Sequence, residues 1–367
     1  MQSISVARVE ALMRELVGIP STAHHEDQIR DAVRQRLTRA GWLTHTDGVG
    51  NLIVAIPGSP GREQAQPLLF NAHMDRVPPG LACHPTVRDG VMYGDGLTNL
   101  GADDVAGLTI ILLAVEALVE RGLSHAPLVL LFTVEEEVGL GGALAFDPLP
   151  CHVQAGLIFD NAGEAGALVT HGAAYLAFDA VLRGHSGHPG QDLTGTASAI
   201  DMFRQLDLPS GSEDDGATRL SLGIITGGTA RNAIPAELTV QGELRTLRDA
   251  AAVAQWQARI HDAFQRAASA GGGEADVTFT PHGVAYRVDE QEPLVQAYRQ
   301  AWEARGQPFQ TLATFVGSDA NALRDRMQIC TVSTGAHNEH TLAEYIALAP
   351  LVDIIEAAVA VAVGYGR

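Results

Sequence analysis

The sequence is poor in cysteine and in positive charge, and each shortage excludes a class of protein. Its three cysteines, Cys83, Cys151 and Cys330, include no CxxC pair, so they indicate neither a disulfide framework nor a thiolate zinc site. A reducing cytoplasm fits this pattern best. There are 24 Lys and Arg residues against 43 Asp and Glu residues, and the net charge of -19 repels nucleic acid and anionic membrane surfaces. We therefore expect no nucleic acid or membrane as a partner.

Long apolar segments are also missing. The longest mostly apolar run, residues 105–115, is too short to span a bilayer. The amino-terminal residues contain no basic segment followed by an apolar core, so we expect no signal peptide. Hydrophobic residues nevertheless make up 46% of the chain and charged residues only 18%, which predicts a large core. A length of 367 residues favours two domains, because single cores rarely grow beyond about 250 to 300 residues.

The central motif is an apolar run, residues 128–134, followed by Glu135, Glu136 and Glu137. The run predicts a strand buried on both faces, which is typical of parallel sheets. In open α/β sheets, ligands bind at the carboxyl ends of such strands. Three adjacent carboxylates repel one another unless cations or shared protons compensate, and a divalent metal is the obvious compensator. A solvated acidic turn is the alternative for this tripeptide taken alone.

A second predicted strand, residues 67–71, leads into His73 and Asp75. Because side chains alternate along a strand, these two residues are expected on the same face. The carboxylate of Asp75 could then orient the imidazole of His73 as the partner of a metal ligand. An ordinary surface pair is the alternative.

Acidic residues recur at two further places of this kind. A glycine-rich loop, residues 94–107, becomes a helix that runs to Glu120 and carries Asp103 and Asp104 near its start. Complementing the helix dipole is the alternative role for these two acids. Another buried strand begins at residue 155 and ends at Asp160. The recurrence of acidic residues at the ends of predicted strands argues against a chance arrangement.

Near residue 170 the pattern changes to strands with one exposed face, which is typical of antiparallel sheets. We expect strands at residues 173–183, 218–225, 236–245 and 276–280, helices at 196–206 and 250–268, and a polar linker at 210–216. These elements suggest a small α+β domain inserted between two parts of a larger one. The expected boundaries are 1–172 for the first part, 173–283 for the insertion and 284–367 for the second part.

The two outer segments carry the remaining elements of the larger domain. Helices are expected at residues 3–18, at 293–305 and at 349–363, with a further helix that has Ser21 or Thr22 as its cap. A short buried strand at 328–332 precedes His337 and His340. Two histidines three residues apart in a loop are often merely exposed, so this pair is ambiguous by itself.

Together, five of these side chains are hard or borderline metal ligands: His73, Asp103, Glu137, Asp160 and His340. They offer one histidine and one carboxylate to each of two metals and leave one carboxylate to bridge them. Hydrolases with two metals need this set of ligands. It also leaves Glu136 beside a ligand and free to act as a base.

The motifs resemble those of the co-catalytic di-zinc peptidases, the family of peptidase T, glutamate carboxypeptidase, aminoacylase and succinyl-diaminopimelate desuccinylase. The peptidase T branch is the most similar. The resemblance extends from about residue 7 to about residue 360. It is carried by six motifs in the family's order: NAHMD at 71–75 with VPPG at 77–80, GADDVAG at 101–107, TVEEE at 133–137, GHSGHPG at 184–190, GGTARNAIP at 227–235 and GSDAN at 317–321.

The resemblance implies an α/β fold: a zinc-peptidase catalytic domain with a mostly parallel sheet flanked by helices, plus the inserted α+β segment as a lid or dimerisation domain. It implies two Zn²⁺ ions, with Co²⁺ or Mn²⁺ as substitutes. His73 and Asp160 would hold one ion and Glu137 and His340 the other, with Asp103 between them.

The same resemblance assigns the remaining roles. Asp75 would orient His73, and Glu136 would be the general base that takes a proton from a metal-bridging water and passes it to the leaving amine. His188 would help stabilise the tetrahedral oxyanion. Asn232 and Arg245 would bind a substrate carboxylate, for which a guanidinium fork is suited.

Two positions depart from the family's pattern. The family usually has Asp where Glu135 stands, and often has Lys where Val105 stands. Neither position ligates metal, so we expect altered detail rather than lost activity.

The favoured function is therefore a cytoplasmic metallo-aminopeptidase that acts on short peptides in the manner of a tripeptidase. An N-acyl-amino-acid deacylase or a carboxypeptidase is the alternative on the same di-metal centre. A metal-binding regulator without turnover is another, against which Glu136 argues. Pairing of the inserted domains into a homodimer stays open.

Overall fold

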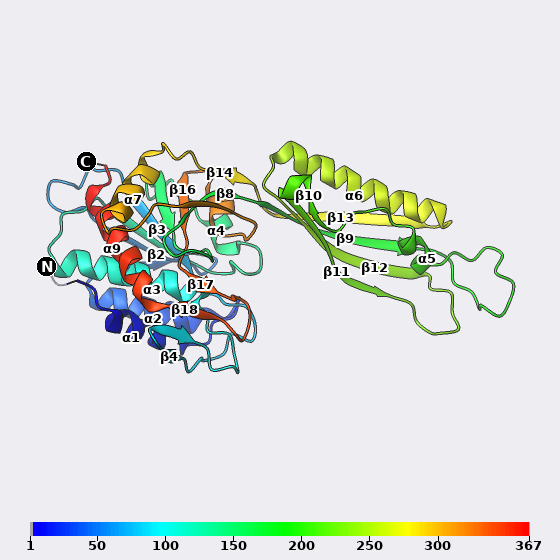
Figure 1. The fold of residues 1–367 in the computed structure, drawn as a ribbon, viewed down its shortest axis with the longest axis horizontal. Coiled ribbons are helices and arrows are strands. Elements are labelled where there is room, and N and C mark those ends of the chain that lie inside the picture. Colours follow the sequence, from blue (N-terminus) through cyan, green and yellow to red (C-terminus); the bar gives the residue numbers. More distant parts are fainter. Residues whose placement is uncertain (1–2, 367) are drawn as a thin grey trace. The chain divides into compact units, whose positions relative to one another are not determined.

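The apolar run before the three glutamates forms β6 (Leu128–Thr133), whose six residues are all buried. The structure is a computed structural model that describes residues 3–366. Its contacts divide the chain into two units, one formed by the segments 3–171 and 287–366 and the other by Gly172–Tyr286 (Figure 1). The expected insertion was 173–283.

The first unit is built on a mixed sheet around β6. The strands follow the order β1 (Thr44–Thr46), β2 (Leu52–Ile56), β6, β3 (Leu68–His73), β7 (Ala155–Ile158), β16 (Gln328–Val332), β8 (Leu168–Gly172) and β14 (Tyr286–Arg287), and β15 (Thr311–Thr314) pairs with β8. The central strands β6, β3, β7 and β16 are parallel to their neighbours in this group. The predicted parallel centre is confirmed, and β2 pairs antiparallel with β6.

This parallel centre brings distant residues to one edge of the sheet. His73 is the last residue of β3 and pairs in register with Thr133, the last residue of β6. Ile158 at the end of β7 pairs with Thr331 near the end of β16. The segments that carry the predicted ligands therefore leave the sheet at the same side.

Helices cover the sheet and pack on one another. They are α1 (Val6–Val17), α2 (Asp27–Arg39), α3 (Ala102–Glu120), α4 (Gly141–Ala145), α7 (Pro293–Glu303), α8 (Ala320–Leu323) and α9 (Leu348–Gly364). Helix α3 contacts β3 and α9, and α1 contacts both α3 and α9. The core lies between them, since α3 is buried along almost its whole length.

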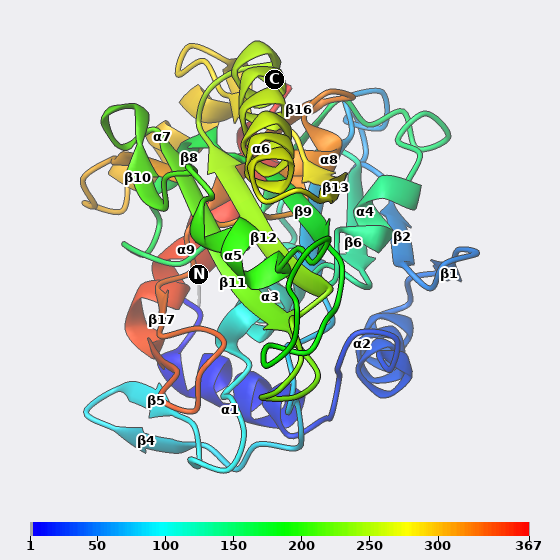
Figure 2. The same ribbon diagram turned by 90° about the vertical axis from the view of Figure 1, so that its right-hand side faces the viewer.

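A second sheet of short strands belongs to the same unit. Its order is β17 (Ala336–His337), β18 (Tyr345–Ala347), β5 (Val91–Tyr93) and β4 (Thr86–Arg88), all antiparallel. Figure 1 labels β17, β18 and β4, and Figure 2 labels β5. It joins the end of the chain to the segment before α3. The loop between β17 and β18 carries His340.

The second unit is an antiparallel sheet covered on one face by helices. Its order is β10 (Gly211–Glu213), β11 (Thr218–Gly227), β12 (Glu237–Thr246), β9 (Ala174–Arg183) and β13 (Glu274–Gly283). Helices α5 (Ala199–Arg204) and α6 (Ala250–Ala270) pack on it (Figures 1 and 2). Alternate residues of β9 are buried against them, among them Leu176, Phe178 and Leu182.

Two expectations about local structure are wrong. The second helix begins at Asp27 after Glu26, not at a cap on Ser21 or Thr22, because Thr22 forms a bridge with Arg76 instead. The polar linker 210–216 contains β10 and a short 3-10 helix (Asp214–Gly216), since β10 pairs with the start of β11. Among the described residues, no helix combines the length and apolar character needed to cross a bilayer.

Candidate metal centre

His73 stands at the carboxyl end of β3 with its ring buried. Its Nε2 atom lies 3.1 Å from Asp103 Oδ1 and 3.9 Å from Asp160 Oδ1. Its Nδ1 atom is 2.9 Å from the backbone oxygen of Asp75 and 3.5 Å from Asp75 Oδ1. The imidazole is therefore held on one side by Asp75 and directs its other nitrogen at two carboxylates.

His340 approaches the same cluster from the loop between β17 and β18. Its Nε2 atom lies 3.2 Å from Asp103 Oδ2 and 3.1 Å from Glu137 Oε1. Asp103 thus faces His73 with one oxygen and His340 with the other. All five predicted ligands are brought together by this arrangement.

Glu137 Oε1 is buried and accepts no hydrogen bond of normal geometry from the described residues, although the His340 nitrogen is close to it. The two atoms lie close enough together to be ligands of one cation. The donors of the cluster are imidazole nitrogens and carboxylate oxygens, which suit zinc and similar divalent ions. The residues present therefore fit a metal site.

Asp75 also fixes the backbone of the three glutamates. Its Oδ1 accepts the N–H of Glu136 at 3.0 Å, and its Oδ2 accepts the N–H of Glu137 at 3.0 Å. The N–H of Glu135 donates to Glu26 Oε1 at 3.1 Å. Every backbone N–H of the glutamate segment thus meets a carboxylate from another part of the chain.

Glu135 is turned away from the cluster. Its Oε1 lies 2.9 Å from Nδ1 of His24, an exposed residue of the loop before α2. His24 in turn donates its backbone N–H to Glu26 at 3.1 Å. The departure from the family's usual Asp at position 135 therefore has a local partner.

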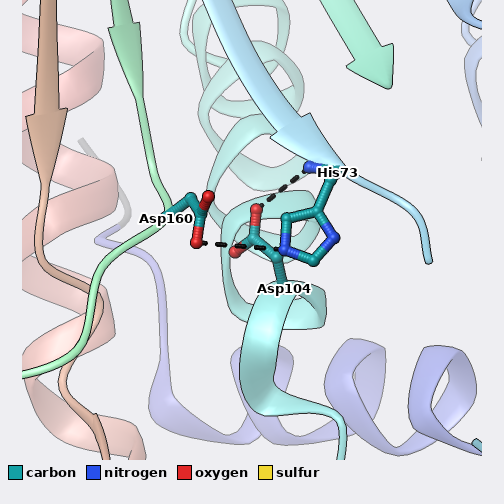
Figure 3. Close-up of side chains that lie close together, drawn as sticks. All are labelled: His73, Asp104 and Asp160. Atoms are coloured by element: carbon teal, nitrogen blue, oxygen red, sulfur yellow. Dashed lines mark hydrogen bonds and ion pairs between the residues drawn. The ribbon is translucent and has the colours of Figure 1, made fainter. Parts of the chain in front are cut away.

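Asp104 is a member of the cluster that sequence reasoning assigned only to the helix start. Its buried carboxylate accepts the N–H of His73 at 3.1 Å and the N–H of Gly107 at 3.0 Å. Figure 3 shows it beside His73 and Asp160. Donor atoms of these three residues lie within 4.8 Å of one another, as do those of His73, Asp103 and Glu137. Its position directly after Asp103 was the only available signal.

Asp319 was also missed as a site residue, although it belongs to the quoted motif at 317–321. It is fully buried, and its Oδ2 accepts the hydroxyl of Thr133 at 2.5 Å. Burial raises the pKa of Asp319, and the charge of Asp75 raises it further. This carboxylate thus holds the side chain of Thr133, the last residue of β6, through a hydrogen bond.

The crowding of acids is visible in their pKa values. Burial raises the pKa values of Glu136, Asp104 and Asp160 well above the usual range, and nearby carboxylates add to the rise. Although burial opposes it, the hydrogen bonds of Asp103 and Asp75 raise the pKa of His73. Hydrogen bonding to Asp103, together with the nearby Glu137, raises the pKa of His340 to about 10. Burial and the mutual repulsion of these carboxylates favour their protonated forms, an effect that bound divalent cations would counteract.

The remaining predicted site residues lie in the second unit. His188 is exposed and its Nδ1 accepts the N–H of Gly190 at 3.1 Å. Asn232 is exposed as well. The Arg245 guanidinium lies 4.3 Å from the centre of the Tyr175 ring and donates to Glu243 Oε1 at 3.0 Å. Arg245 therefore already has a carboxylate partner within its own sheet.

Residues 69–364 match the family model described as Peptidase family M20/M25/M40. Three solved structures illustrate the similarity. The aminopeptidase PepT of Bacillus cereus is 28% identical, with a TM-score of 0.88 and 98% of each chain covered. A tripeptidase of Staphylococcus aureus is 24% identical, with a TM-score of 0.92 and 99% of each chain covered. The YXEP protein of Bacillus subtilis, a dinuclear metal binding peptidase, is 17% identical, with a TM-score of 0.74, covering 98% of this chain and 97% of that one.

Proposed function

This chain belongs to peptidase family M20/M25/M40, and from that premise we propose that it is a metal-dependent exopeptidase that removes amino-terminal residues from short peptides, tripeptides above all. Whole-length similarity to an aminopeptidase and to a tripeptidase supports this specificity. The observation that carries the proposal is the position of Asp103, whose two oxygens lie 3.1 Å and 3.2 Å from two different histidines.

We propose that the metals are two zinc ions. His73 and Asp160 would hold one, Glu137 and His340 the other, and Asp103 would be shared. When bound, the ions would supply Lewis acidity to the scissile carbonyl and to the attacking water. The residues of the chain have the separate task of moving protons and holding the peptide.

Glu136 is the residue best suited to move the proton. Partial burial raises the pKa of its carboxyl, and its backbone N–H is held by Asp75. It would accept a proton from the attacking water and donate it to the leaving amine, for which a pKa near the working pH is ideal. Asp75 would keep both His73 and the segment of Glu136 in place.

The second unit would supply the contacts to the substrate. His188 is proposed to stabilise the oxyanion, and Asn232 and Arg245 to bind the carboxylate of the peptide. Exposure of the side chains of His188 and Asn232 supports this role. At Arg245, a substrate carboxylate would have to replace Glu243.

A panel of peptides tests the proposal. Free tripeptides, amino-blocked tripeptides, dipeptides and N-acyl amino acids would be incubated with the protein, with and without a chelator. We expect release of the amino-terminal residue from free tripeptides only, loss of activity on chelation, and recovery on adding zinc or cobalt. Hydrolysis of the blocked peptides or of N-acyl amino acids would favour a carboxypeptidase or deacylase instead, and turnover in the absence of bound metal would refute the metal mechanism.

We also propose a cytoplasmic location and a homodimer. The three cysteines are unpaired, as expected in a reducing compartment. In the second unit, β10 pairs only with residues 218–220 of β11, so residues 221–227 have β12 as their single neighbour among the described strands. An open strand edge with exposed Ile224 and Ile225 is suited to pairing with a second copy.

A further inference from the structure

Arg76, directly after Asp75, is among the most deeply buried residues of the first unit, with a relative exposure of 1%. Its guanidinium donates only to neutral oxygens in the described part of the chain. These are Ser21 Oγ at 3.0 Å and the carbonyl oxygens of Val17 at 3.4 Å, Gly80 at 3.3 Å, Leu81 at 3.3 Å and Ile19. A charge buried in this way is costly unless an opposite charge is close.

Glu344 is a buried carboxylate that, after Cys83, counteracts the lowering of the Arg76 pKa by burial. It follows the loop of His340 and is itself only 1% exposed. Its Oε2 accepts the N–H of Gly101 at 2.7 Å, and its Oε1 accepts the N–H of Asp103 at 3.0 Å. Burial raises the pKa of Glu344 to about 7, and the two N–H donors counteract that rise.

Gly101 is the point at which the two residues meet. Its φ of 74° lies in the left-handed region, and a Cβ atom added there would be 2.2 Å from Cδ of Arg76. Arg76 therefore packs against the backbone whose N–H is held by Glu344. Two residues later that backbone carries the carboxylate placed between His73 and His340.

We propose that Arg76 and Glu344 are paired positioning residues, which hold the turn Gly101–Asp103 so that each oxygen of Asp103 meets a different histidine. Neither residue would touch substrate or metal. The inference rests on the proposed two-metal centre and adds to it the part that keeps the shared ligand in place. Mutation of a residue that hydrogen-bonds to a metal ligand typically lowers metal affinity by about 10-fold to 100-fold.

Glu344→Gln is the most conservative test, because glutamine has the same shape but turns one acceptor into a donor that faces an N–H group. Arg76→Met keeps much of the volume and removes the charge and all five donors. Glu356→Gln is the matched control. Glu356 also uses both oxygens, for Arg121 at 2.7 Å and 2.7 Å and for the N–H of Ile4 at 3.2 Å, and contacts none of the proposed ligands.

Each protein would be loaded with zinc and measured in three ways: metal content per chain after dialysis, zinc affinity by competition with a chromophoric chelator, and melting temperature without metal. We expect both test variants to bind zinc at least about tenfold more weakly than wild type, whereas Glu356→Gln keeps wild-type affinity even where it melts earlier. The double variant should lose little more than either single variant, because the two residues act on one turn.

Three results would overturn the inference: wild-type zinc affinity in Glu344→Gln, an equal loss of affinity in Glu356→Gln, or losses of the two single variants that multiply in the double variant. Should Arg76→Met fail to fold, Arg76→Lys serves in its place. Lysine keeps the charge but cannot reach the same set of oxygens, so zinc should again bind more weakly, and unchanged binding would count against the proposal. Wild-type protein that takes up no metal would refute the proposed function itself, whereas metal-loaded wild type with unaffected variants would refute only the role of the pair.

Discussion

Three consecutive glutamates follow β6, and each has a different environment. Glu135 pairs with His24, Glu136 has a carboxyl whose pKa is raised by burial, and Glu137 faces His340. The difference arises from the carboxylates of Glu26 and Asp75, which fix the three backbone N–H groups in sequence. Side chains of the same kind thus acquire separate environments from their backbone contacts.

The role of Glu136 can be separated from metal binding. Glu136→Gln should lower kcat for a free tripeptide by about 10²-fold to 10⁴-fold, because the amide cannot accept the proton. Its metal content should stay at the wild-type value, since Glu136 is not among the proposed ligands. Glu135→Gln is the control and should retain most of the activity. Full turnover in Glu136→Gln would contradict the assignment of the base.

Asp75 is expected to act both on the imidazole of His73 and on the backbone of Glu136 and Glu137. In Asp75→Asn one oxygen becomes an NH₂ group that opposes the N–H of Glu136 or Glu137, and the contact with His73 is weakened. We expect kcat and zinc affinity to fall by about 10-fold to 100-fold each. Steady-state kinetics and chelator competition on the same preparation measure both. A loss of kcat at unchanged zinc affinity would show that only the segment of Glu136 depends on Asp75.

The individual residues differ in how far the sequence could indicate them. His73, Glu137 and Asp160 follow strands whose apolar runs are readily recognised, so their meeting at one sheet edge was predictable. Glu344 and Gly101 are separated by 243 positions, and no pattern near either residue indicates their hydrogen bond. The burial of Arg76 could not be predicted either, because a lone arginine after a motif is normally expected at the surface.

At the scale of elements, helix α3 connects the core to the site. Its first turn departs from helical geometry at Asp103 and Asp104, and the remainder is buried against β3 and α9. Gly107 lies one turn further on. A Cβ atom there would be 2.4 Å from the carbonyl oxygen of Phe159 and 2.5 Å from Asp104 Oδ1. The glycine is needed for the close approach of α3 to the strand that precedes Asp160.

Gly107→Ala should therefore destabilise the protein, although alanine is the better helix former by about 1 kcal/mol. Overpacking of this kind costs about 1 to 3 kcal/mol and would displace Asp104 from the N–H of His73. Gly364→Ala at the end of α9 is the control, because nothing lies within 4 Å of its added Cβ. Thermal unfolding should show a lower melting temperature for the first variant and an equal or higher one for the second. Equal stabilisation by both would disprove the close approach.

Elements with a clear apolar pattern were predictable, and strands of two or three residues were not. Strand β16 was expected and found at residues 328–332, and α9 differs from its expected range by one residue at each end. The strands β4, β5, β17 and β18 have two or three residues each, too few to display a period. The start of α2 was misplaced because Thr22 is taken up by a bridge to Arg76, which is a tertiary contact.

At the scale of the whole molecule, the chain forms two units with separate cores. The change near residue 170 from fully buried to alternating strands suggested an insertion, because alternation reflects a sheet with one exposed face. In the structure, β9 is buried at alternate residues against α6 through Phe178, Leu182 and Phe264. The outer edge of β11 has no partner among the described strands along residues 221–227.

The open edge of β11 leads to the last prediction. Residues 221–227 offer backbone groups and the exposed side chains of Ile224 and Ile225 to a partner strand. A second copy can satisfy this edge symmetrically by antiparallel pairing, so the purified protein should be a dimer at micromolar concentration. Ile225→Lys should yield monomers, since a lysine on an edge opposes its own copy across a twofold axis.

Ile200→Lys is the control for that experiment, because Ile200 is also exposed but lies on α5, away from the edge. Light scattering coupled to size exclusion should report a dimer for wild type and for Ile200→Lys, and a monomer for Ile225→Lys with unchanged zinc content. If Ile225→Lys stayed dimeric, the edge of β11 would not be the interface. A monomeric wild-type protein would show that the edge of β11 is stable without a partner strand. Its short length and the adjoining β10 would then be what limits pairing.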